Sequence, residues 1–126
     1  MLQSQVITSS NNNALTSNTI TTSGSNGVGI ILSTTSNNNA LTSNTIKTTH
    51  ATTAYGVYLD SGINNTFTNG NITATQVNDI RIASGSGIFT NVTYNKSDLG
   101  FDNGATGNIT VKYYADVTIN TSSGTA

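Results

Sequence analysis

The sequence contains no cysteine, no proline, no tryptophan and no glutamate. Without cysteine, the chain has neither a disulfide framework nor thiolate metal ligands. No apolar run approaches the roughly 20 residues that a membrane-spanning helix needs, so we do not expect membrane insertion. Only 7% of the residues are charged and the net charge is −1. No basic patch is available to follow a phosphate backbone, so nucleic acid is not an expected partner.

Ser, Thr, Asn and Gly together supply more than half of the chain. Disordered chains usually combine such polarity with high charge and few β-branched residues. Here charges are few and Thr, Val and Ile are plentiful, which favours β-strands. Met1 is soon followed by the polar residues Gln3, Ser4 and Gln5, so we identify no intact signal peptide. This indicates either that a signal was removed or that the chain is an excerpt of a longer protein.

One segment occurs twice without change: SNNNALTSNTI fills residues 10–20 and again residues 36–46. A third copy, GINNTFTNGNI, follows at 62–72 with the same period of 26, and a degenerate fourth begins at Ile88. A period in the twenties built from short strands predicts a solenoid, in which each coil buries its apolar side chains against its neighbours. We therefore predict an all-β fold, a right-handed parallel β-helix of about three to four coils.

The apolar residues of the copies align in four columns. The columns are Leu15, Leu41, Phe67 and Phe89; Ile20, Ile46, Ile72 and Val92; Ile30, Val57 and Ile80; and Leu32, Leu59 and Ile82. The last two columns are two residues apart, as expected for the buried face of a strand. The residues between these two columns, Ile31, Tyr58 and Arg81, should therefore face outward.

Asparagines repeat with the same period and have two open interpretations. The repeated positions are Asn12, Asn38 and Asn64, and next to them Asn13, Asn39 and Asn65. Their amides either stack from coil to coil in hydrogen-bonded ladders or only shape turns. At a second corner we expect Asn18, Asn44 and Gly70 to adopt the left-handed conformation.

A longer motif connects the chain to a known family. Residues 12–20 read N-N-x-[ILF]-T-x-N-x-I, and a G-[IV]-x-L segment follows at Gly29–Leu32 and again at Gly56–Leu59. Over residues 5 to 95 this pattern resembles the parallel β-helix repeat of NosD-like proteins. The resemblance implies the fold and an extracellular or cell-surface location, with the periplasm as the alternative, but it implies little about activity. Copper handling is not carried over, because the chain has one His, one Met and no Cys.

The search for catalytic and metal-binding residues yields no committed site. Enzymes on β-helices need clustered carboxylates, whereas Asp60 and Asp79 fall in different columns. Asp98 and Asp102 lie in a loop where turn formation is the simpler interpretation than Ca²⁺ binding. His50 has no partner for a triad or a zinc site. We therefore predict a protein that is not an enzyme, with no catalytic residues, no bound metal and no cofactor.

Three outward residues, Tyr55, Tyr58 and Arg81, are the candidate ligand-binding group. Outward aromatic rings can stack on sugars. The alternative is a cation–π pair between Tyr58 and Arg81 that only stabilises the surface. Sequons of the Asn-x-Ser/Thr type mark candidate glycosylation sites. They begin at Asn64, Asn71, Asn91, Asn95, Asn108 and Asn120.

We divide the chain into β-helix repeats at 1–107 and C-terminal strands at 108–126, which form a cap or begin a following domain. Three functional hypotheses remain. The first is a non-catalytic structural or adhesive module of an extracellular or cell-surface protein. The second is a β-helix that binds or processes carbohydrate, with glycans as partners. The third is a solenoid that assembles end to end with other copies of itself through unpaired strand edges.

Overall fold

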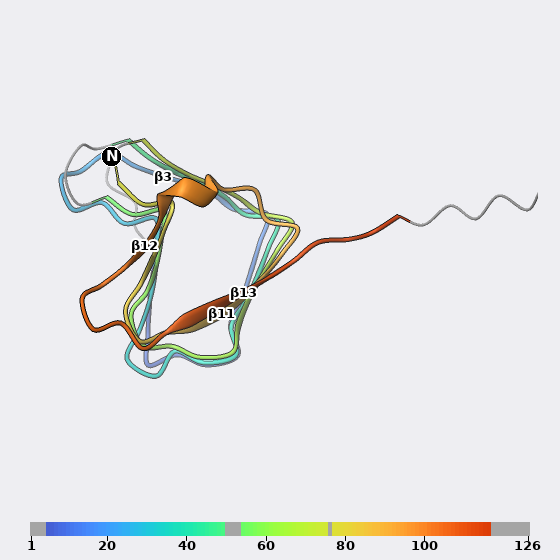
Figure 1. Ribbon diagram of the computed structural model, residues 1–126, viewed down its shortest axis with the longest axis horizontal. Helices are drawn as coiled ribbons and strands as arrows, with labels where there is room; N and C mark the ends of the chain where they lie inside the picture. The colour runs from blue at the N-terminus through green and yellow to red at the C-terminus, as the bar shows by residue number, and fades with distance from the viewer. Residues whose placement is uncertain (1–4, 50–53, 76, 117–126) are drawn as a thin grey trace, which may run out of the picture.

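The computed structural model describes residues 5–49, 54–75 and 77–116. These residues form an all-β solenoid of about 4 turns, with parallel sheets as its walls. Figure 1 looks along the tube and shows a triangular cross-section with one sheet on each side. The predicted stack of parallel coils is thereby confirmed. Its right-handed sense, which parallel crossover connections strongly prefer, stays a prediction.

Each strand pairs with the equivalent strand one turn away. Sheet A contains β1 (Gln5–Thr8), β4 (Ile30–Ser33), β7 (Val57–Leu59), β10 (Ile80–Ile82) and β12 (Leu99–Phe101). Sheet B contains β2 (Ala14–Thr16), β5 (Ala40–Thr42), β8 (Asn65–Thr68), β11 (Ser86–Thr90) and β13 (Asn108–Lys112). Sheet C contains β3 (Thr19–Thr22), β6 (Thr45–Thr48) and β9 (Asn71–Ala74), and a 3-10 helix, η1 (Lys96–Asp98), precedes β12. We call β1, β2 and β3 the first coil, and β12 and β13 the last coil.

The core is built from columns of apolar side chains along the axis of the tube. Leu15, Leu41 and Phe67 are in register, and the Phe67 and Phe89 rings stack with centroids 4.3 Å apart. The columns that begin at Ile30 and Leu32 also align as predicted. The columns predicted from the sequence lacked the members at their ends. In the first coil, Ile7 extends the column of Leu32.

The alignment of Val92 is wrong. The bridge between Asn71 and Thr93 places Val92 beside Gly70 rather than beside Ile72. The side chain of Val92 is still buried and packs in the core. The step of 22 residues from Phe67 to Phe89 is kept from Asn71 to Thr93, so Tyr94 rather than Val92 comes next in line with Ile72.

The predicted left-handed corner lies one residue earlier than expected. Positive φ occurs at Ser17, Ser43 and Asn69, with values of 57°, 55° and 53°, and not at Asn18, Asn44 or Gly70. Asn18 and Asn44 have a different role. The main-chain N–H of Asn18 donates to Asn44 Oδ1 over 2.9 Å, and its side-chain Nδ2 donates to the same oxygen. These residues therefore join two coils instead of turning the chain.

The two interpretations of the repeated asparagines hold for different columns. Asn12, Asn38 and Asn64 have positive φ of 60°, 57° and 57°, so they shape the turn. The next column forms the ladder. Asn13 Nδ2 donates to Asn39 Oδ1 over 2.9 Å, and Asn39 Nδ2 donates to Asn65 Oδ1 over 3.0 Å. Each of these amide oxygens also accepts the main-chain N–H of the asparagine one turn before it.

A glycine directly precedes β4 and β7 of sheet A, where neighbouring coils approach each other closely. A Cβ on Gly29 would lie 2.5 Å from the carbonyl oxygen of Gly56 and 2.3 Å from a methyl group of Ile46. No side chain fits at that position without displacing the wall. The glycine of the G-[IV]-x-L motif is therefore required by the packing of one coil on the next.

The strand at the start of the C-terminal segment continues sheet B. β13 pairs with β11 in parallel, with Asn108 opposite Ser86, a shorter step than the repeat of 26. The described chain then leaves the tube sideways (Figure 1). The rest of the predicted C-terminal strands, residues 117–126 with Asn120, lies outside the described residues, as does His50. No helix in the described part of the chain has the length or apolar character to cross a membrane.

Candidate functional site

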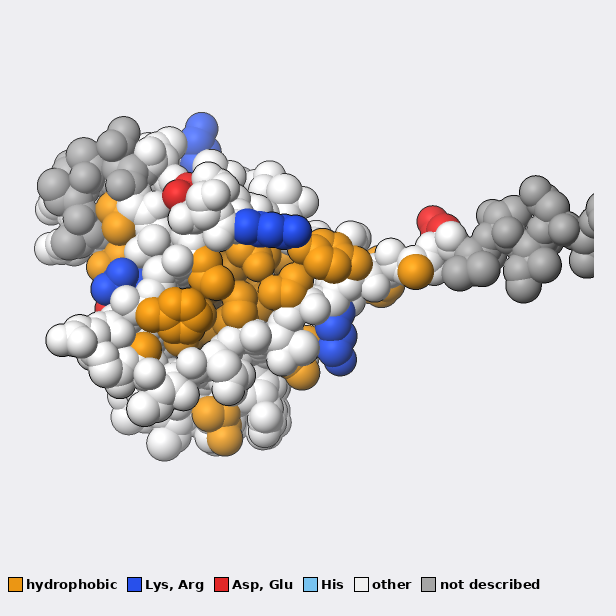
Figure 2. Space-filling view, in the orientation of Figure 1, with side chains coloured by type: hydrophobic (Ala, Val, Ile, Leu, Met, Phe, Trp, Pro, Cys, Tyr) orange, Lys and Arg blue, Asp and Glu red, His pale blue; other side chains and the backbone are white. Residues whose placement is uncertain are grey.

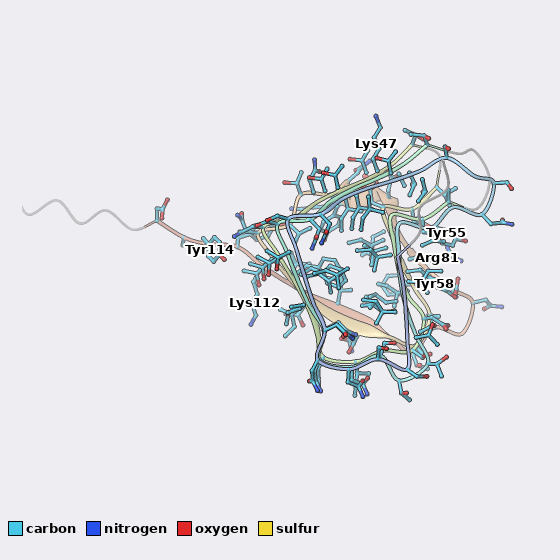
Figure 3. All side chains as sticks on the ribbon, turned by 180° about the vertical axis from the view of Figure 1, so that it is seen from behind. Lys47, Tyr55, Tyr58, Arg81, Lys112 and Tyr114 are labelled. Carbon is cyan, nitrogen blue, oxygen red and sulfur yellow. The ribbon has the colours of Figure 1, made fainter. Side chains whose placement is uncertain are left out.

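The three predicted site residues gather on the outer face of sheet A. Tyr58 in β7 and Arg81 in β10 are directly paired, and they continue the outward row to which Ile31 belongs. Tyr55 lies just before β7, and its ring centroid is 5.7 Å from that of Tyr58. Figure 3 shows the three labelled side chains together outside the wall. The sequence-based expectation that Tyr58 and Arg81 face outward is confirmed.

A residue that sequence analysis treated as a loop former completes the cluster. Asp102 follows β12, and its Oδ1 accepts from Arg81 Nε over 2.6 Å. Its Oδ2 accepts from the hydroxyl of Tyr58 over 2.8 Å. Arg81 also donates through Nη1 to Asn78 Oδ1, over 3.2 Å. We call Tyr55, Tyr58, Arg81 and Asp102 the sheet A cluster.

The cation–π contact exists, but with a different partner. The guanidinium carbon of Arg81 lies 5.6 Å from the ring centroid of Tyr55. The alternative pairing of Arg81 with the ring of Tyr58 is not observed among the described residues, and the hydroxyl of Tyr58 donates to Asp102 instead. Arg81 therefore contacts one tyrosine ring and reaches the other tyrosine only through a shared carboxylate.

The electrostatics of the sheet A cluster are balanced. Desolvation raises the pKa of Tyr58 to about 12, and the hydrogen bond to the Asp102 carboxylate adds to this effect. The hydrogen bond from Tyr58 lowers the pKa of Asp102 below its ordinary value, and Arg81 lowers it further. At neutral pH Tyr58 is therefore neutral, and Asp102 is ionised opposite a cation. Neither pKa lies near neutrality, where a general acid or base works best.

Asp79 and Asp98 have partners outside the sheet A cluster. Asp79 is buried, and its Oδ2 accepts the main-chain N–H of Asn95 over 2.6 Å while Oδ1 accepts that of Ala74. Asp98 accepts from the Asn95 amide over 2.7 Å, whereas Asp102 faces Arg81, so the two carboxylates have different partners. The described residues contain no group of three or more His, Cys, Asp or Glu that could hold a metal ion.

Five of the six sequon asparagines belong to the described residues, and all five are exposed: Asn64, Asn71, Asn91, Asn95 and Asn108. Two of the five amide nitrogens are already engaged. Asn91 Nδ2 donates to Asn69 and Asn95 Nδ2 donates to Asp98. Since the amide nitrogen is the atom to which a glycan would be attached, Asn64, Asn71 and Asn108 are the better-presented candidate sites.

Fold and site together define a parallel β-solenoid protein with a closed ion-pair cluster on one wall. Comparisons with family models, with curated proteins and with solved structures found no match to this chain.

Proposed function

We propose that this chain is a non-catalytic structural or adhesive β-helix module of an extracellular or cell-surface protein. The observation that carries the proposal is that its strongest polar groups bond to one another. Asn39 is fully buried, and its amide joins the coils on either side. Arg81 and Asp102 neutralise each other on the outer wall. A side chain whose charge and hydrogen bonds are already satisfied offers little to a substrate.

The walls favour a stiff spacer. Main-chain ladders run from coil to coil along three sheets, and side-chain ladders reinforce two of the corners. Each coil contacts mainly its two neighbours, as in other solenoids, so length along the axis is maintained by local contacts. The resemblance to NosD-like repeats supports the location outside the cytoplasm, and the exposed sequons at Asn64, Asn71 and Asn108 are consistent with it.

Carbohydrate binding is the second candidate, and the exposed side of Tyr55 and Tyr58 is what favours it. A sugar that stacked on Tyr55 would compete with Arg81 for the ring. Sugar binding would add apolar contact with the ring but would remove the contact between Arg81 and the ring. That contact is worth roughly 0.5–1 kcal/mol at an exposed site. The spacer role requires no such exchange.

A glycan array separates the two candidates. The spacer role predicts no saturable binding by the wild-type chain or by the double variant Tyr55→Ala/Arg81→Ala. Ile63→Ala is the matched control, because Ile63 is an exposed apolar side chain away from the sheet A cluster. Saturable binding that disappears in the double variant and persists in the control would replace the spacer role with the carbohydrate role.

Mechanical strength tests the spacer role directly. Pulling the chain between two handle domains should give a discrete unfolding force, because the parallel ladders of several coils must break. Extension without any force peak, as for an unstructured chain, would contradict the spacer role.

A further inference from the structure

The last coil leaves the interior of the tube open. Leu99 and Phe101 continue the inward-facing columns of Ile80 and Ile82, because β12 pairs with β10 in register. Phe101 nevertheless remains 51% exposed, since no coil covers it among the described residues. Figure 2 shows hydrophobic side chains gathered over this end of the tube, which faces the viewer. The described chain does not fold back over the opening, because it leaves sideways after β13.

The last coil also presents unpaired backbone groups. Asn108 N–H donates to Gly85, and the carbonyl oxygen of Lys112 accepts from Asn91, so these two residues of β13 face β11. Successive residues of a strand alternate in direction, and Ile109 and Val111 therefore direct their N–H and C=O groups to the open edge. No further strand follows along this edge in residues 77–116.

The first coil presents the matching face. Its residues 10–20 are identical to residues 36–46, so its free face duplicates the face with which the second turn binds the first. In that internal contact Asn39 Oδ1 accepts two hydrogen bonds from Asn13. The equivalent oxygen of Asn13 has no donor among the described residues. Ala40 N–H donates to the carbonyl of Asn13, which leaves the backbone groups of Ala14 and Thr16 on the free edge.

We propose that the last coil of one copy of this chain docks on the first coil of a second copy, head to tail. Sheets A and B then continue across the junction in the register that they follow within the chain. Val111 lies on Leu15 of the second copy and Phe101 lies on Ile7, so the apolar columns continue. Ile109 N–H donates to the free oxygen of Asn13, and Ile109 C=O accepts from the N–H of Ala14.

Charge does not oppose this junction. Residues 5–22 of the first coil contain no ionisable side chain. The last coil and η1 carry charges of both signs, with Lys96 and Lys112 against Asp98 and Asp102.

On the third side, η1 lies where sheet C would continue, so the junction uses sheets A and B (Figure 1). Because the two faces differ, the contact is heterologous and repeats into a filament rather than closing into a dimer. This assembly is independent of the proposed spacer role.

Two variants block opposite ends of the chain. Ala14→Pro removes an N–H that points to the free edge of the first coil, and proline at an edge position prevents strand pairing. Phe101→Asp puts a charge into the opening of the last coil, where the side chain is already half exposed. Ile63→Asp is the matched control, because Ile63 is 47% exposed on a turn in the middle of the tube. Circular dichroism checks that each variant keeps its strands, and Asn13→Ala replaces Ala14→Pro if that variant unfolds.

Sedimentation velocity over a hundredfold range of concentration, with negative-stain microscopy at the highest, provides the test. The wild type and Ile63→Asp should form filaments one tube wide, and each blocked variant alone should stay monomeric, with association weakened at least tenfold. An equimolar mixture of the two blocked variants should form dimers and nothing longer, since one free head meets one free tail. A wild type that stays monomeric throughout, or an Ala14→Pro variant that dimerises alone, would overturn the proposal.

Discussion

At the scale of single residues, the main-chain N–H of Asn44 lies where the next copy of the repeat has a different residue. Asn18 N–H donates to the side chain of Asn44, but the next turn has Gly70 in place of an asparagine. Asn44 is buried, and its main-chain N–H has no acceptor among the described residues. A buried N–H without a partner is costly, so the second corner ladder stops one turn too early.

Gly70→Asn should restore that ladder. A Cβ on Gly70 would lie 3.2 Å from the carbonyl oxygen of Asn44 and 3.8 Å from Val92, so a small adjustment admits the side chain. We expect the free energy of unfolding to rise by about 1 kcal/mol beyond that of Gly70→Ala, which lacks the acceptor. Urea denaturation of both variants measures the difference, and equal stabilities would show that the amide makes no such bond.

The tyrosine of the sheet A cluster should make stability depend on alkaline pH. The pKa of Tyr58 is raised to about 12 in the folded chain, whereas a tyrosine in the unfolded chain titrates near its ordinary value of 10.0. The folded state therefore holds this proton more tightly. Its contribution to stability is complete below pH 10 and is lost as the pH rises toward 12. Urea midpoints between pH 9 and pH 12 should fall less steeply in Tyr58→Phe than in the wild type. Parallel curves would refute this linkage.

The meeting of Tyr58 and Arg81 could be predicted because each occupies the same position in consecutive turns. Asp102 could not, because it follows a turn that departs from the repeat. In sheet A the step from Ile30 to Val57 is 27 residues, but the step from Ile80 to Leu99 is 19. The remaining signal was Leu99-Gly100-Phe101, whose alternation matches an inward-outward-inward strand. It would have placed Asp102 on the outer face, two residues beyond Gly100, which lies opposite Arg81.

At the scale of elements, the asparagine ladder is a corner element whose members have unequal surroundings. Asn39 lies within the ladder, fully buried, and its oxygen accepts two hydrogen bonds from Asn13. Asn13 lies at the end of the ladder and is exposed. The same residue type in the same repeat position therefore contributes differently according to its place along the tube.

Asn39→Ala should cost about 2–4 kcal/mol, because it removes the acceptor of both the main-chain N–H and the amide of Asn13, removes the amide donor to Asn65, and empties a fully buried position. Asn13→Ala, the matched control, should cost less than about 1.5 kcal/mol, because Asn39 Oδ1 still accepts the main-chain N–H of residue 13. Chemical denaturation of the two variants gives both values. Comparable costs would mean that the ladder is no more than a turn preference repeated in each coil.

The elements themselves could be predicted wherever copies of the repeat are identical or nearly so. Exact repetition of residues 10–20 fixes which side chains stack, and alternation of apolar residues then fixes which face is buried. Beyond Ile88 the copies diverge, and the alignment of Val92 failed there because it followed apolar character, whereas the register of Phe67 with Phe89 continues unchanged through the corner. The sequence also could not predict which residue of this turn has positive φ, because Ser17 and Asn18 are both polar residues of types common in turns.

At the scale of the whole molecule, stability should follow position along the axis, because each coil contacts only its neighbours. Leu15 and Leu41 occupy the same place in two identical segments, but Leu41 is 2% exposed between two coils, whereas Leu15 has a coil on one side only. Leu41→Ala should cost about 2–5 kcal/mol, and Leu15→Ala less than half as much, because the end coil can relax or fray around a smaller side chain. Denaturation at concentrations where the chain is monomeric measures both costs without interference from stacking. Equal costs would mean that the tube unfolds as one indivisible unit, or that the end at Leu15 is covered as completely as the middle.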